Sequence, residues 1–146
     1  MDDVAASREE AETALRQGDW ASVSAGLRWF QGNAEGPADF ALVVEQLRYP
    51  NLVPMKIAAR TLIRRYGALG LSEVIKYLVS DDIEANAHEQ IFGVLEELYM
   101  EEDVPVRDAL LSMIADERYV QLWPVVTEIL GEPRLAQGLQ GVLKPQ

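Results

Sequence analysis

The sequence predicts an all-α protein, and three observations support that prediction. Apolar residues recur at spacings of three and four along nearly the whole chain, which is the periodicity of one face of a helix. No segment alternates apolar and polar residues over the length of a strand. Roughly two to six residues connect the periodic segments, as in helical bundles and solenoids. The length of 146 residues fits a single domain.

The starts and ends of the helices follow from their capping residues. Ser7 and Glu10 are spaced as a capping box for the first helix, and Asp19 is placed to cap the second. Gly67 and Gly70 are expected to mark a helix end and a turn rather than a phosphate-binding loop, because no strand precedes them. The nine predicted helices cover about 8–17, 20–31, 37–49, 54–66, 72–80, 83–100, 105–116, 119–130 and 133–143.

An internal repeat is the most informative pattern. Residues 40–80 align without a gap onto residues 91–131, so three consecutive helices match three consecutive helices. Amphipathic helices share apolar positions by chance, but chance does not readily explain a proline, a glutamate and a basic residue that recur in one frame. Those matches are Pro54 with Pro105, Glu45 with Glu96, and Lys56 with Arg107.

The repeated unit resembles an armadillo or HEAT repeat, because a helix is followed by a helix that opens with proline and carries a basic residue, and then by a third apolar helix. The resemblance implies a short right-handed stack of about nine helices, whose inner helices form a concave binding surface. The chain differs from the family in two respects. It has only two clear copies of the repeat, and its repeat unit is slightly longer than usual. The expected parts are N-terminal capping helices (1–36), two three-helix units (37–82 and 83–131) and a C-terminal cap (132–146).

The charge of the chain bears on the class of partner. Twenty-four acidic residues against 13 basic ones give a net charge of −11, which disfavours binding to a phosphate backbone. The excess favours encounter with a basic protein, although it also serves solubility alone. The chain has no cysteine, and neither a signal peptide nor an apolar stretch of membrane-spanning length is found, so a cytoplasmic protein without a membrane partner is expected.

Two clusters of charged residues are candidate binding sites. The first is acidic and lies at the C-terminal end of the sixth helix, where carboxylates oppose the helix dipole. A solvated turn is the alternative interpretation. The second is a basic stripe on the fourth helix, which either neutralises nearby carboxylates or binds an acidic peptide. The acidic site comprises Glu97, Tyr99, Glu101, Glu102 and Asp103, and the basic stripe comprises Lys56, Arg60 and Arg64.

No residue is predicted to be catalytic, to hold a cofactor or to bind a metal. His88 is the only histidine, and a structural or surface role is expected for it. The aromatic residues of the second and eighth helices are expected to pack in the core or between repeats, and the alternative is that they anchor an interface. They are Trp20, Trp29, Phe30, Tyr119 and Trp123.

Three functions remain open at this point. The expected one is a non-catalytic protein of the bacterial immunity or inhibitor type, which occludes a basic protein. The alternative is a scaffold or adaptor module that binds a peptide or helix within a larger assembly. An enzyme built on a helical-repeat stack is the third, and the missing nucleophile and metal site count against it.

Overall fold

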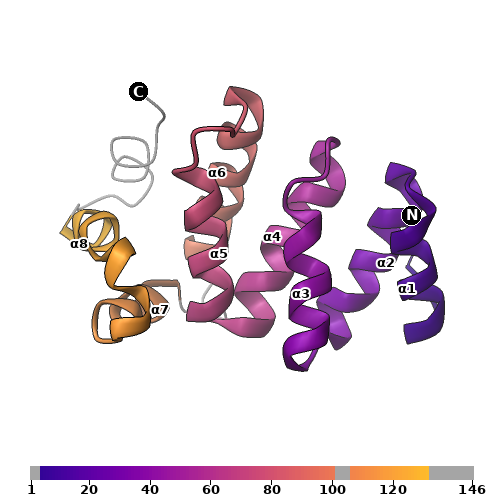
Figure 1. Cartoon of the computed structure of the whole chain (residues 1–146), viewed down its shortest axis with the longest axis horizontal. Helices are drawn as coiled ribbons and strands as arrows, with labels where there is room; N and C mark the ends of the chain where they lie inside the picture. Colours follow the sequence, from indigo (N-terminus) through magenta and orange to yellow (C-terminus); the bar gives the residue numbers. More distant parts are fainter. Residues whose placement is uncertain (1–3, 101–105, 132–146) are drawn as a thin grey trace.

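The computed structural model describes residues 4–100 and 106–131, and in these ranges the chain is helical with no strand. The all-α prediction is therefore confirmed. The helices are α1 (Arg8–Gln17), α2 (Trp20–Asn33), α3 (Gly36–Gln46), α4 (Leu52–Tyr66), α5 (Ala68–Leu78), α6 (Ala85–Met100), α7 (Val106–Ile114) and α8 (Trp123–Gly131), with a 3₁₀ helix, η1 (Glu117–Leu122), before α8. They follow one another along the long axis of the molecule, from α1 near one end to α8 near the other (Figure 1).

The first two helices begin where the sequence predicts, because side chains at their N-termini accept hydrogen bonds from free backbone N–H groups. Ser7 Oγ accepts from the Glu10 N–H at 3.2 Å, and the Glu10 carboxylate accepts from the Ala6 N–H at 2.9 Å. The Asp19 carboxylate accepts from the Ser22 N–H at 2.9 Å. The predicted caps at Ser7 and Asp19 are both confirmed, whereas the return bond of the capping box comes from the N–H of Ala6 and not from that of Ser7.

The start of α5 differs from the prediction, which places the helix at 72–80 and both nearby glycines at caps. Gly67 does separate α4 from α5, with a φ of 58° that favours glycine. Gly70 is not a cap, because it is buried inside α5. A methyl group at Gly70 would overlap the backbone carbonyl of Leu62 on α4. This glycine is therefore required by the close approach of two helices.

The predicted helix over 119–130 is divided in the structure. Its first part is the 3₁₀ helix η1, in which Tyr119 has a non-helical φ of −108° and ψ of 18°. The second part is α8, which carries Pro124 in its first turn. Proline has no N–H to donate back to the preceding turn, so a continuous α-helix is interrupted here. The predicted ninth helix, 133–143, lies outside the described residues.

Three helices, α2, α4 and α6, form the centre of the molecule. α4 contacts α2 and α6, and we call these three helices the α2–α4–α6 row. α1 packs against α2, whereas α3 and α5 pack against α4. Fully buried aliphatic and aromatic side chains fill the space between them, as close packing requires. They include Leu27, Phe30, Leu62, Leu71, Ile75, Ile91, Leu95 and Leu98.

The aromatic residues and His88 occupy several environments. Phe30 and Tyr119 are buried as expected, and Trp29 packs edge-to-face on Phe30 with ring centroids 5.1 Å apart. The prediction is wrong for Trp20, which is 51% exposed because it is the first residue of α2, next to an exposed turn. His88 is buried on α6.

A buried carboxylate joins α3 to α1. Asp39 is 3% exposed and accepts a hydrogen bond from Arg8 Nη1 at 2.6 Å and another from the Glu35 N–H at 3.0 Å. Burial opposes the ionisation of Asp39, but these two hydrogen bonds outweigh it and hold the pKa of its carboxyl below the usual value. Arg8 also lies over the ring of Trp29, 5.1 Å from its centroid. The cluster therefore connects α1, α2 and α3.

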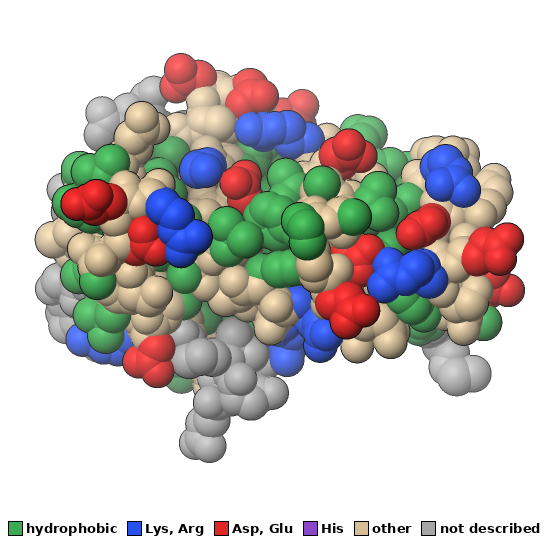
Figure 2. All heavy atoms as spheres, turned by 60° about the horizontal axis from the view of Figure 1, so that its bottom comes forward, with side chains coloured by type: hydrophobic (Ala, Val, Ile, Leu, Met, Phe, Trp, Pro, Cys, Tyr) green, Lys and Arg blue, Asp and Glu red, His purple; other side chains and the backbone are tan. Residues whose placement is uncertain are grey.

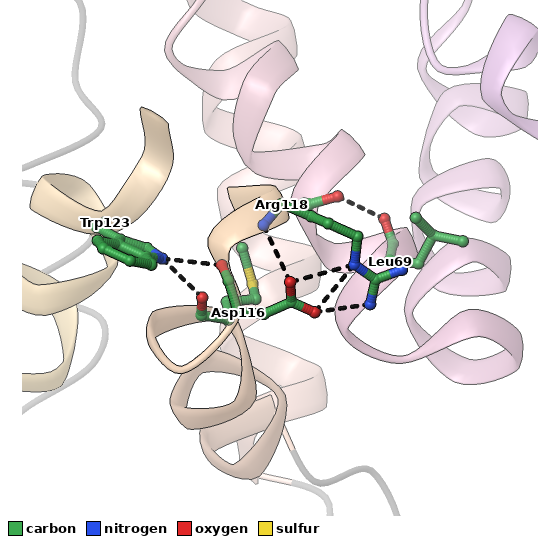
Figure 3. Close-up of polar contacts among 6 residues, drawn as sticks. Leu69, Asp116, Arg118 and Trp123 are labelled. Carbon is green, nitrogen blue, oxygen red and sulfur yellow. Dashed lines mark hydrogen bonds and ion pairs between the residues drawn. The ribbon is translucent and has the colours of Figure 1, made fainter. Parts of the chain in front are cut away.

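A tryptophan joins α8 to the end of α7 (Figure 3). The indole Nε1–H of Trp123 is shared between the Met113 carbonyl oxygen at 2.8 Å and the Asp116 carbonyl oxygen at 3.2 Å. The Asp116 carboxylate accepts from the Arg118 backbone N–H at 2.9 Å and from its guanidinium at 2.6 Å. The side-chain hydrogen bond from Arg118 lowers the pKa of Asp116. The indole thus adds a donor to two carbonyl groups that also accept from the backbone N–H groups of Asp116 and Tyr119.

Replacing Trp123 by phenylalanine is expected to lower the free energy of unfolding by about 1 kcal/mol, because two carbonyl groups lose their shared donor. Urea denaturation followed by circular dichroism measures the change. Trp20→Phe is the matched control, since this half-exposed side chain should tolerate the change with a loss below about 0.5 kcal/mol. Equal stability of Trp123→Phe and the natural chain would contradict the role given to the indole.

Candidate binding surface

α4 differs in charge from the chain as a whole, because it carries four basic residues and no acidic one in a protein of net charge −11. Arg65 Nε donates to the Ala34 carbonyl oxygen at 3.0 Å, just beyond the end of α2. Arg64 is exposed and has an interaction of its own within the chain. Lys56 and Arg60 are partly buried and lie on the side of α4 that adjoins α2.

Lys56 and Arg60 line a hollow of about 360 Å³ between α2 and α4. Three of its residues lie three, four and seven positions after Val53 on α4, so they share one face of the helix with it. Val53 is 40% exposed and contributes apolar surface next to the charges. The complete lining is Arg28 and Gln31 from α2 with Val53, Lys56, Ile57 and Arg60 from α4. The hollow thus combines three cationic side chains with two aliphatic ones.

An ion pair joins one residue of the acidic candidate site to one residue of the basic stripe. The Arg60 guanidinium donates to the Glu97 carboxylate, which joins α4 to α6. The side chain of Arg60 is 27% exposed and that of Glu97 is 55% exposed, so the pair lies at the surface. Glu97 of the predicted acidic site is therefore the partner of Arg60 of the predicted basic stripe.

The electrostatics of the hollow are determined by what compensates each cation. Glu97 compensates Arg60, and Arg28 has an interaction of its own within the chain. Lys56 has no carboxylate at ion-pair distance among the residues described here. A partly buried ammonium without a neighbouring carboxylate leaves the hollow with positive charge that an external anion can neutralise.

The remainder of the predicted acidic site cannot be placed beside Glu97. Glu101, Glu102 and Asp103 lie outside the described residues, and so does the side chain of Tyr99. Their expected role in meeting a basic partner stays a prediction. Of the predicted basic stripe, Lys56 and Arg60 line the hollow, whereas Arg64 is absent from its lining.

Sequence reasoning missed part of the hollow. It selected Lys56 and Arg60 by their spacing on one helix, but it did not select Arg28, Gln31 or Val53. Arg28 and Gln31 are three residues apart on α2, which is a signal of one shared helix face. Nothing in the local sequence indicates which face of α2 adjoins α4, so these residues emerge only from the packing of the two helices.

The surface otherwise mixes side chains of several kinds. Figure 2 shows one face on which acidic and basic side chains are interspersed with hydrophobic ones. Across residues 4–100 and 106–131, no group of three or more histidine, cysteine, aspartate or glutamate side chains has an arrangement that could hold a metal ion. No helix in the same ranges is both long and apolar enough to cross a membrane.

The fold and the hollow define an all-α protein with a small, cation-lined surface site. Comparison with family models, with curated proteins and with solved structures finds no match to the chain. The function must therefore be inferred from the chemistry of the surface.

Proposed function

We propose that the chain is a non-catalytic protein-binding domain of the armadillo/HEAT-like kind, and that the exposed face of the α2–α4–α6 row is its contact surface. The single observation that carries the proposal is the hollow of about 360 Å³ on this row, in which cations lie beside exposed aliphatic surface. Protein interfaces combine an apolar centre with charged groups that set orientation and specificity.

The order of contacts supports the helical-repeat part of the proposal. In a stack of repeats, each inner helix packs against the inner helices of its neighbours. The contacts from α2 to α4 and from α4 to α6 fit the inner layer of a stack of helix pairs, with α1, α3 and α5 packed against it. The internal repeat in the sequence makes α7, not α6, the counterpart of α4, so a division into three-helix units rests on the sequence alone. On that basis we propose two such units, 37–82 and 83–131, in a right-handed stack with capping segments at 1–36 and 132–146.

A second candidate is an inhibitor of the immunity type that occludes a basic protein. The net charge of −11 favours it, and so does the Glu97 side chain, which is more than half exposed although it pairs with Arg60. The two candidates differ in the charge of the partner. Both place the chain in contact with a protein in the same compartment, which we propose to be the cytoplasm.

Site-specific photocrosslinking in the cells that make the protein tests the proposed contact surface. A photoreactive residue at Val53 should give one dominant crosslinked protein, because Val53 is 40% exposed beside the hollow. The same residue at Leu111, which is 42% exposed on α7, is the matched control and should give little of that product.

The identity of the crosslinked protein separates the two candidates. An acidic contact segment on the partner favours the adaptor, whereas a strongly basic partner whose binding weakens as salt rises favours the inhibitor. Equal crosslinking from Val53 and Leu111, or none from either position, would contradict the assignment of this face.

A further inference from the structure

We propose that the hollow between α2 and α4 binds an acidic side chain presented by a partner protein together with a neighbouring aliphatic one, and that Glu97 pairs with Arg60 of this site until the partner arrives. The inference rests on the proposed function only in naming a protein segment as the source of the carboxylate. The preference for a carboxylate beside an aliphatic group is inferred from the residues that line the hollow.

One cation of the hollow already binds a carboxylate of the chain, although that carboxylate is not part of the lining. Arg60, on the wall of the hollow, holds the carboxylate of Glu97 from α6. Because the Glu97 side chain is 55% exposed, its ion pair is open to water and adds little stability to the fold. An incoming carboxylate can therefore replace Glu97 at Arg60 at small cost.

Lys56 supplies charge that no carboxylate within residues 4–100 and 106–131 neutralises. It lies one helical turn before Arg60 on the same face of α4, and no carboxylate among the described residues pairs with it. A carboxylate in the hollow would meet the ammonium of Lys56 and the guanidinium of Arg60. Charge-assisted hydrogen bonds of this kind are about twice as strong as neutral ones.

The overall negative charge does not prevent this binding. At physiological salt the Debye length is about 8 Å, so acidic groups elsewhere on the surface are largely screened from a ligand in the hollow. The cations that line the hollow are the charges the ligand meets at contact. The net charge of −11 instead selects against a long polyanion, which would extend beyond these cations onto acidic surface.

The apolar lining restricts the ligand further. Val53 and Ile57 lie beside the cations, and Val53 is 40% exposed. A volume of about 360 Å³ corresponds to roughly a dozen water molecules at about 30 Å³ each, which is room for a few side chains and not for a folded element. An aspartate or glutamate next to a leucine, isoleucine or valine matches this combination of charge and apolar surface.

A peptide selection tests the inference with the whole chain. Short random peptides displayed on phage are selected against the protein, and the enriched peptides are synthesised and their affinities measured by fluorescence anisotropy. We expect the enriched peptides to pair Asp or Glu with an aliphatic residue. Lys56→Glu should weaken their binding by about tenfold or more, and Glu97→Gln should strengthen it by about threefold, because Arg60 loses its competing carboxylate.

Matched variants and a second ligand make the result decisive. Lys76→Glu on α5 changes the same charge outside the hollow and should leave peptide affinity within about twofold. An oligothymidine strand is measured in parallel. The inference is overturned if no peptide is selected, if selected peptides lack acidic residues, if Lys56→Glu and Lys76→Glu act alike, or if the oligonucleotide binds more tightly. Dominant crosslinking from Val53 with any of these results would leave the proposed function standing.

Discussion

Gly70→Ala is expected to lower the free energy of unfolding by about 4 kcal/mol, the largest stability change predicted for this chain. The added methyl group would overlap the backbone carbonyl of Leu62, and a backbone group cannot move aside as a flexible side chain can. α5 would have to separate from α4, the helix around which the core is packed. Urea denaturation followed by circular dichroism measures the change.

Gly93→Ala is the matched control, because Gly93 also lies inside a helix but a methyl group there would meet nothing within 4 Å. Alanine is the better helix former, so this variant should gain up to about 1 kcal/mol. Similar effects of the two substitutions would show that α4 and α5 do not approach as closely as described.

Asp39→Ala is expected to cost about 2 to 3 kcal/mol at neutral pH, because the Arg8 guanidinium and the Glu35 N–H both lose their acceptor. The effect should depend on pH. The pKa of Asp39 in the folded protein lies below its ordinary value of 3.8, so its ionised form stabilises the fold above that value. This stabilisation is lost as the pH falls through the folded-state pKa.

The pH dependence is measured as the difference in free energy of unfolding between the natural chain and Asp39→Ala from pH 7 to pH 3. The difference should stay constant down to about pH 4 and then shrink. Glu45→Ala, which removes an exposed carboxylate from the same helix, should change stability by less than about 0.5 kcal/mol. A difference for Asp39→Ala that does not vary with pH would contradict the ionised, hydrogen-bonded state of this carboxylate.

Local signals in the sequence were sufficient for much of the fold. The first helix is predicted at its observed bounds, because the Ser7 cap and its partner Glu10 are encoded within four residues. The fourth helix begins two residues before its predicted start at Pro54, because the Asn51 side chain accepts from the Val53 N–H at 2.9 Å. Here the capping residue rather than the proline determines where the helix begins.

Features that depend on packing could not be derived in this way. Gly70 resembles a turn residue in the sequence, and its role appears only when α5 is placed against Leu62. Asp39 resembles an ordinary surface acid until α1 brings Arg8 to it from 31 residues away. Each position combines a common residue type with a contact made by a distant helix, and local periodicity carries no information about such contacts.

The same distinction applies to the candidate site. Helical spacing was enough to select Lys56 and Arg60, and the charge pattern was enough to select Glu97. Arg60 and Glu97 are 37 residues apart in the chain, and their pairing depends on the packing of α4 against α6. Because these two residues form one ion pair, a partner that binds at Arg60 also meets Glu97.

The affinity of the protein crosslinked from Val53 tests the central claim, that the exposed face of the α2–α4–α6 row binds a protein, most directly. It should be measured at physiological salt for the natural chain, for Lys56→Glu in the hollow and for Leu111→Glu on α7. Lys56→Glu should weaken binding by about tenfold or more, and Leu111→Glu should stay within about twofold of the natural chain. Equal affinities for all three proteins would contradict the claim.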